Sequence, residues 1–139
     1  MIPLDAQDHD FSKYTVLAVD DIPLNLLLVQ KMLARYNFKF RTAANGQQAL
    51  DAVEQEKPNL ILLDLMMPGI DGFEVIRRLR ENPRTADIRI IILSALNSND
   101  EVVKGFDLGA NDYLVKPIIM EKLLSCVITQ LQVADAIKQ

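Results

Sequence analysis

The sequence of 139 residues contains one cysteine, one histidine and no tryptophan. Because Cys126 is alone, no disulfide can form within the chain, and no spacing of cysteine and histidine resembles a zinc site. No apolar run is long enough to span a membrane, and the N-terminus has neither the basic start nor the apolar core of a signal peptide. These absences favour a cytoplasmic protein.

The chain also has no excess of positive charge. Its formal net charge is −4 and its isoelectric point is near 4.9, so nothing attracts it to nucleic acid phosphates or anionic lipid. We therefore expect no direct nucleic-acid binding and no membrane insertion. Half of the residues are hydrophobic and 24% are charged, which is the composition of one globular domain of this length. Residues 1–13 are polar and show no period, which predicts a poorly structured leader before a domain at 14–137.

Short β-rich runs alternate with segments of helical spacing along the rest of the chain. Two of the runs are apolar throughout, as strands covered on both faces must be. Five strands alternating with five helices predict an α/β fold: a single doubly wound (βα)5 domain with a five-stranded parallel sheet in a three-layer sandwich. The expected strands are residues 15–19, 39–43, 60–63, 88–93 and 113–115.

The helical segments suggest which side chains face the core. We expect Leu24, Leu27, Leu28 and Met32 to do so in the first helix, and Val102, Val103 and Phe106 in the fourth. The last helix should run from Met120 to about Ile137. Its apolar stripe is long, which leaves two options open: a connector to a further domain of a longer protein, or a contact in a homodimer.

Polar side chains stand where the strands end. The first strand is followed by Asp20 and Asp21, the third by Asp64, the fourth by Ser94 and the fifth by Lys116. The carboxyl ends of parallel strands share one edge of the sheet, so these side chains should meet although they are far apart in sequence. The second strand ends in Ala43, as expected for an outer strand away from the site.

Three carboxylates packed together repel one another unless a cation lies between them. Oxygen ligands without histidine or cysteine suit Mg²⁺, with Mn²⁺ as an alternative. Lys116 would add a mobile positive charge suited to a phosphate, and Ser94 a hydroxyl donor. Asp64, held in this way, can attack phosphorus and form an acyl phosphate.

These residues lie in motifs that resemble the receiver domain of two-component response regulators, the chemotaxis (CheY-like) type. The matching stretches are "VDD" at 19–21, "LLDLMMPGIDG" at 62–72, "IIILSA" at 90–95 and "GANDYLVKP" at 109–117. The resemblance implies a flavodoxin-like sheet in the order 2-1-3-4-5 and a cis peptide bond before Pro117.

The resemblance also implies a role for each matching residue. Asp64 would be the phosphoacceptor, Lys116 the lysine that contacts the phosphoryl group, Ser94 the switch hydroxyl, and Tyr113 the aromatic that turns inward with it. The implied metal ligands are Asp20, Asp21, Asp64 and the backbone carbonyl of Met66. Asp71, in contrast, is expected to serve turn geometry and is left out of the site.

By the same resemblance, the chain is a phosphoacceptor signalling switch and not an enzyme, apart from self-phosphorylation and slow self-dephosphorylation. Its phosphodonor would be a histidine kinase or histidine phosphotransfer protein. The signal would pass through the face of the fourth helix, fifth strand and fifth helix to a downstream protein or fused domain. Slow dephosphorylation is expected because Met66 and Leu96, which flank the phosphoryl group in the family, cannot hydrogen-bond an attacking water.

Two alternatives remain open at this point. A Mg²⁺-dependent phosphatase of the haloacid dehalogenase type also uses an aspartate at a strand end, but it requires a second aspartate two residues later, where this chain has Met66. A receiver-shaped binding module that is never phosphorylated usually lacks an acidic residue or the lysine, and this chain retains them.

Overall fold

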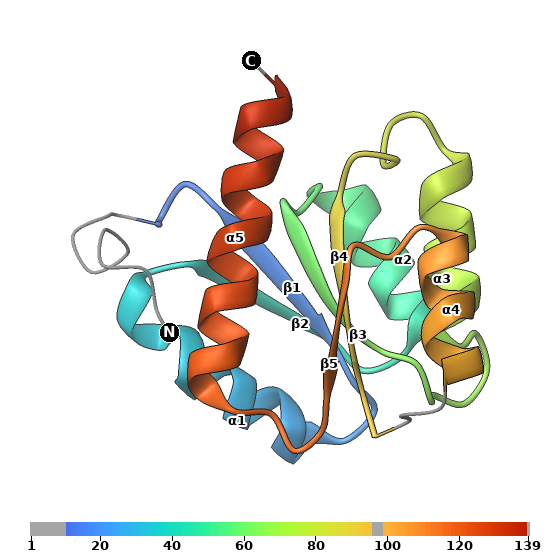
Figure 1. Cartoon of the computed structure of the whole chain (residues 1–139), viewed down its shortest axis with the longest axis horizontal. Helices are drawn as coiled ribbons and strands as arrows, with labels where there is room; N and C mark the ends of the chain where they lie inside the picture. The colour runs from blue at the N-terminus through green and yellow to red at the C-terminus, as the bar shows by residue number, and fades with distance from the viewer. Residues whose placement is uncertain (1–10, 96–98, 139) are drawn as a thin grey trace.

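A computed structural model describes residues 11–95 and 99–138 (Figure 1). Strands and helices alternate along the chain as the sequence predicts, and each strand boundary lies within one residue of its expected position. A short 3-10 helix, η2, follows the first helix and was not predicted. The elements are β1 (Thr15–Val19), α1 (Pro23–Leu33), η2 (Ala34–Tyr36), β2 (Lys39–Ala43), α2 (Gly46–Gln55), β3 (Leu60–Asp64), α3 (Gly72–Glu81), β4 (Arg89–Ser94), α4 (Asn99–Leu108), β5 (Asp112–Val115) and α5 (Met120–Lys138).

The five strands form one parallel sheet in the order β2-β1-β3-β4-β5. Helices α1 and α5 cover one face of the sheet, and α2, α3 and α4 cover the other (Figure 1). Two separate hydrophobic clusters correspond to these two interfaces. The predicted three-layer α/β fold and the strand order implied by the resemblance are both confirmed.

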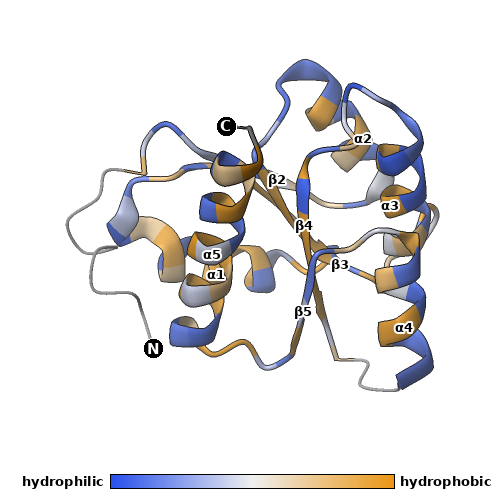
Figure 2. Cartoon of the chain, turned by 45° about the horizontal axis from the view of Figure 1, so that its top comes forward, coloured by the Kyte–Doolittle hydropathy of each residue, from blue (hydrophilic) through white to orange (hydrophobic). Residues whose placement is uncertain are grey.

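The inner strands carry the core. Every residue of β1 and β3 is buried, and so is every residue of β4 after Arg89. In Figure 2 the inner strands β3 and β4 are hydrophobic over most of their length. Because both faces of these strands are covered, Asp64 at the end of β3 is drawn into the interior together with the apolar residues before it.

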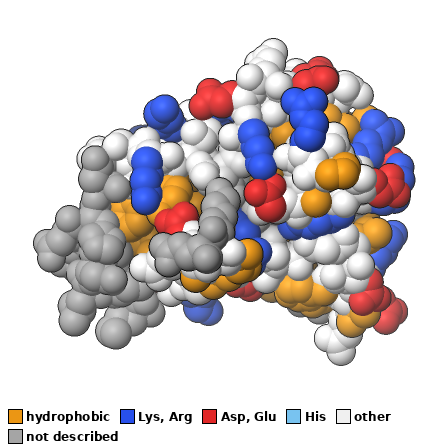
Figure 3. All heavy atoms as spheres, turned by 90° about the horizontal axis from the view of Figure 1, so that it is seen from above, with side chains coloured by type: hydrophobic (Ala, Val, Ile, Leu, Met, Phe, Trp, Pro, Cys, Tyr) orange, Lys and Arg blue, Asp and Glu red, His pale blue; other side chains and the backbone are white. Residues whose placement is uncertain are grey.

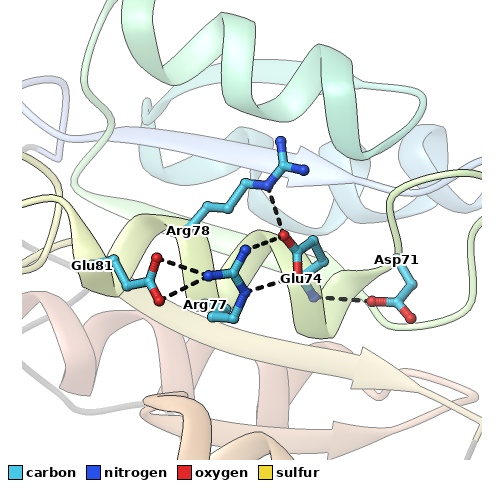
Figure 4. A network of polar contacts seen from close by, with 5 residues as sticks. All are labelled: Asp71, Glu74, Arg77, Arg78 and Glu81. Carbon is cyan, nitrogen blue, oxygen red and sulfur yellow. Dashed lines mark hydrogen bonds and ion pairs between the residues drawn. The ribbon is translucent and has the colours of Figure 1, made fainter.

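Side-chain caps fix where two of the helices begin. The Asn45 side chain accepts a hydrogen bond from the Gln48 N–H at the start of α2, and the Asp71 side chain accepts one from the Glu74 N–H at the start of α3, over 2.9 Å. Figure 4 shows Asp71 at the end of this helix, next to a network that joins Glu74 to arginines of α3. The structural role predicted for Asp71 is confirmed.

In two helices, most of the side chains expected to face the core are exposed, although Met32 of α1 packs against it. In α1, Leu24 is 61% exposed, and the buried residues are Val29 and Leu33. Eight of the eleven residues of this helix are apolar, so the spacing alone could not distinguish the side that faces the core. In α4, Val103 and Phe106 are exposed, and the buried residue is Gly105, which packs against Ile92 of β4.

The segment before β1 contributes to the core. Phe11 is only 3% exposed and packs against the rings of Tyr36 and Phe38. Tyr14 donates a hydrogen bond from its hydroxyl to Asp135 near the end of α5. Phe11 is therefore part of the folded domain and not of a loose leader. The remainder of the predicted leader, residues 1–10, lies outside the described residues and stays a prediction.

Figure 3 shows the molecule from above, at the edge of the sheet opposite to the strand ends that carry the polar residues. Acidic and basic side chains are interspersed on this face, and Lys57 pairs with Asp87 over 2.6 Å. Among the helices of the described part of the chain, none is both long enough and apolar enough to cross a membrane.

Candidate functional site

The polar residues predicted from the strand ends meet at the carboxyl edge of the sheet. Val19 of β1 lies opposite Leu63 of β3, so the residues that follow, Asp20 and Asp64, are neighbours. On the other side, the Lys116 N–H donates to the Ser94 carbonyl over 2.9 Å, which continues the pairing of β4 with β5. Parallel pairing therefore brings together side chains that are far apart in sequence.

The acidic cluster consists of Asp20, Asp21 and Asp64. One carboxylate oxygen from each lies within 4.8 Å of the others. Asp20 and Asp64 are each 6% exposed, whereas Asp21 is open to solvent. Three carboxylate oxygens form a hard donor set, which fits a small divalent cation such as Mg²⁺, and one open side leaves room for water ligands.

Lys116 lies between the two buried carboxylates. Its Nζ is 2.9 Å from Asp20 Oδ2 and 3.7 Å from Asp64 Oδ2, and its side chain is 21% exposed. A buried carboxylate is costly unless it is paired, so Lys116 stabilises both acidic residues. The peptide bond from Lys116 to Pro117 is cis, as the resemblance implies.

Asp20 has two further hydrogen-bond donors, both from the start of α1. The Ile22 N–H donates to Asp20 Oδ1 over 2.9 Å, and Asn25 Nδ2 donates to Asp20 Oδ2 over 3.1 Å. Asn25 was not predicted as a site residue. Its only signal in the sequence is the position in "DDIPLN", one helical turn after the acidic pair, where a side chain can fold back onto the residues before the helix.

Among the described residues, Asp64 is held by fewer and longer hydrogen bonds than Asp20. The Met66 N–H donates to Asp64 Oδ1 over a long 3.3 Å, and Lys116 is the nearby cation. Burial raises the pKa of Asp64, Lys116 opposes this rise, and the negative charge of Asp20 adds to it. The side chain of Met66 is 62% exposed beside the acidic cluster. Its carbonyl as a metal ligand stays a prediction.

Ser94 and Tyr113 lie on neighbouring strands next to this cluster. Ser94, at the end of β4, is 1% exposed. Burial raises the pKa of Tyr113, and the neighbouring Ser94 opposes this rise. The Tyr113 hydroxyl itself is buried, so the ring points inward. Leu96, the other predicted neighbour of the phosphoryl group, lies outside the described residues.

Comparison with known proteins agrees with this arrangement. Residues 16–128 match the family model of the response regulator receiver domain. A "Probable cyclic di-GMP phosphodiesterase" of Vibrio cholerae is 39% identical over 124 residues, which are 89% of this chain and 28% of that protein. Protein PilH of Pseudomonas aeruginosa is 35% identical over 81% of this chain and 93% of its own length. The chemotaxis protein CheY4 of Vibrio cholerae superposes with a TM-score of 0.79 at 30% identity, covering 84% of this chain and 97% of that one.

The chain belongs to the response regulator receiver domain family. It is a phosphoacceptor signalling domain of the two-component type, with the CheY-like fold and the acidic cluster at which receiver domains bind Mg²⁺. It spans 28% and 52% of the lengths of two of its curated relatives, which carry further domains or segments. The two alternative functions are not favoured.

Proposed function

We propose that Asp64 is the phosphoacceptor, with Lys116 as the residue that contacts the phosphoryl group and Asp20, Asp21, Asp64 and the Met66 carbonyl as the ligands of Mg²⁺. The observation that carries this proposal is the juxtaposition of three carboxylates within 4.8 Å, with Lys116 Nζ 2.9 Å from one buried carboxylate and 3.7 Å from the other. The bound cation would neutralise the charge of the phosphoryl oxygens during transfer. Mn²⁺ would serve in place of Mg²⁺.

In the proposed reaction, an Asp64 carboxylate oxygen attacks the phosphorus of the donor. The new bond is an acyl phosphate, and the bond from phosphorus to the donor breaks, so that its electron pair leaves with the donor. Transfer needs positioning and charge neutralisation more than proton transfer. Lys116 supplies the positive charge, and Ser94 lies at the end of the neighbouring strand with a hydroxyl to offer.

The output of the switch is proposed to pass through α4, β5 and α5. Engagement of Ser94 by the phosphoryl group would hold Tyr113 inward and shift the population toward one surface of these elements. Seven large apolar residues of the described chain are exposed on or next to these elements, which supports a protein-binding face. They are Val103 and Phe106 of α4, Val115 of β5, Ile119 before α5, and Met120, Val133 and Ile137 of α5.

The partners follow from this assignment. The phosphodonor would be a histidine kinase or a histidine phosphotransfer protein. The phosphorylated chain would then pass the signal to a downstream protein or a fused domain. The chain itself would carry out self-phosphorylation and slow self-dephosphorylation and no other catalysis. A cytoplasmic location is supported by the free thiol of Cys126. A homodimer through α5 would use Val133 and Ile137, which are exposed on the last turns of this helix.

The test is covalent labelling with acetyl phosphate and Mg²⁺, followed by intact mass and by the rate of labelling. Asp64→Asn should not be labelled, because the amide cannot attack phosphorus. Asp71→Asn is the matched control, since Asp71 is a neighbouring aspartate that caps α3 and an asparagine also caps well. Labelling of Asp64→Asn at the wild-type rate would show that the acceptor is another residue.

A second measurement addresses the phosphatase alternative. That class of enzyme needs an aspartate at the position of Met66, so the chain should not release phosphate repeatedly from a generic phosphate ester. If the wild-type chain releases phosphate over many turnovers and Asp64→Asn does not, the chain is a phosphatase and not a switch.

A further inference from the structure

Asn25 contacts the site through Asp20. It lies in the first turn of α1, and its backbone N–H donates to the Ile22 carbonyl over 3.0 Å, which fixes the turn that follows the acidic pair. Its side-chain Nδ2 reaches back to Asp20 Oδ2 over 3.1 Å. The local backbone therefore directs the half-buried Asn25 amide toward the buried Asp20 carboxylate. The contact is not a chance one at the surface.

Asp20 Oδ2 is shared by two donors. Lys116 Nζ lies 2.9 Å from this oxygen, and Asn25 Nδ2 lies 3.1 Å from the same atom. The other oxygen of Asp20 already accepts from the Ile22 N–H. If Lys116 leaves, Asn25 is therefore the donor that remains on Oδ2 within the described part of the chain.

A phosphoryl group on Asp64 would draw Lys116 away from Asp20. A phosphoryl group on Asp64 would place new negative charge beside an ammonium that is now 3.7 Å from Asp64 Oδ2 and closer to Asp20. Asp20, Asn25 and Lys116 also line one groove of about 410 Å³, so the lysine side chain borders open space and is not enclosed on all sides. The apolar walls of the groove are Leu28, Val29, Met32, Leu93, Pro117 and Ile118.

We propose that Asn25 is a positioning residue of the phosphoryl-transfer site: its amide holds the Asp20 carboxylate in place when Lys116 moves from Asp20 to the phosphoryl group. This inference rests on the function proposed above. Without Asn25, a carboxylate that is 6% exposed would lose the last donor that the described residues give to Oδ2 as the lysine departs. Asp20 would then rotate toward water or keep Lys116, and either response weakens the phosphorylated state.

The experiment compares Asn25→Ala with the wild-type chain in two states. Beryllofluoride with Mg²⁺ mimics the phosphoryl group, and Mg²⁺ alone reports the resting site; both affinities are measured by calorimetry. We expect Asn25→Ala to weaken beryllofluoride binding about tenfold, the size of one hydrogen bond to a charged group, and to weaken Mg²⁺ binding at most a few-fold because Lys116 still holds Asp20. A merely structural role would weaken both equally.

Gln30→Ala is the matched control, because Gln30 is an exposed amide on the same helix. It should change neither affinity. Equal losses in the two states for Asn25→Ala, or no loss in either, would overturn the role of Asn25 and leave Asp64 as acceptor untouched. Failure of the wild-type chain to bind beryllofluoride would instead overturn the proposed function, and this inference with it.

Proton exchange of side-chain amides tests the proposal on the wild-type chain, without any substitution. In the beryllofluoride state, the Asn25 side-chain amide should exchange its protons with water more slowly than the Gln30 amide, as a bonded donor does. Exchange of the two amides at the same rate in that state would show that Asn25 releases Asp20, contrary to the proposal.

Discussion

Gly72 links the start of α3 to the position of Asp64, and a methyl group added there tests how tightly the site is held. A Cβ on Gly72 would lie 2.6 Å from the Asp64 carbonyl oxygen and 2.8 Å from the Leu65 Cα. Both neighbours are backbone atoms, and the Gly72 N–H donates to the Leu65 carbonyl over 3.1 Å. Relief of the clash therefore requires the end of β3 to move, and Asp64 moves with it.

The size of the effect follows from this contact. Overpacking of this kind costs about 1–3 kcal/mol, which for a domain of this length lowers the melting temperature by roughly 3–12 °C. A shift of about 1 Å in a reacting group can lower a rate by about a hundredfold. We therefore expect Gly72→Ala to fold and to have a lower melting temperature. A displacement of this size should slow its labelling by acetyl phosphate roughly 10- to 100-fold.

Gly105→Ala is the matched comparison. Its Cβ would also meet a close neighbour, at 2.5 Å, but that neighbour is the Cδ1 atom of Ile92, the end of a side chain that can rotate. Alanine in place of glycine inside a helix gains up to about 1 kcal/mol, so the net change in stability should be within about 1 kcal/mol of zero. The labelling rate should stay at the wild-type value. Wild-type stability and labelling in Gly72→Ala would refute the reasoning that α3 fixes Asp64.

Three further perturbations test other parts of the molecule. Phe11→Ala should lower the free energy of unfolding by about 3 kcal/mol, because a buried ring is lost, whereas Ile137→Ala, at a side chain that is 71% exposed, should change it little in the same denaturant titration. Arg77 holds the pKa of Glu74 at about 2, below its ordinary 4.5, so the ion pair stabilises the fold fully above pH 4.5 and loses this contribution as the pH falls toward 2. The difference in melting temperature between wild type and Glu74→Gln should shrink over that range, and a constant difference would contradict the assignment. Met66→Asn should shorten the lifetime of the phosphorylated chain about tenfold, since the amide can orient a water, and an unchanged lifetime would show that position 66 does not face the phosphoryl group.

The topology and most of the site could be predicted because both depend on local patterns. Apolar runs such as residues 60–63 mark strands covered on both faces, and parallel strands must end at one edge. The sequence could therefore predict that Asp64 and Lys116 lie close together, although they are 52 positions apart. The structure adds the distances and shows that Lys116 lies closer to Asp20 than to Asp64.

The errors arose where the local pattern is ambiguous. In α1 most residues are apolar, so the period could not show that Val29 and Leu33 face the core while Leu24 faces water. Phe11 is a lone aromatic in a polar stretch, and its burial depends on the rings of Tyr36 in η2 and Phe38 just before β2, which only the tertiary fold brings near. The contact of Asn25 with Asp20 was missed because a side chain that turns back on its own helix start leaves no periodic signal.

The two buried carboxylates differ in how many hydrogen bonds they accept from the described residues, and this difference supports the roles proposed for them. Asp20 accepts from the Ile22 N–H, from Asn25 and from Lys116, so its lone pairs are engaged and its orientation is fixed. Asp64, equally buried, has the Met66 N–H at 3.3 Å and Lys116 at 3.7 Å. A carboxylate whose oxygens are weakly engaged keeps a lone pair for attack, whereas one held by three donors is suited to orient a cation. The donors around each carboxylate therefore support the proposed roles, with Asp64 as the nucleophile and Asp20 as a fixed ligand, although both residues are aspartate.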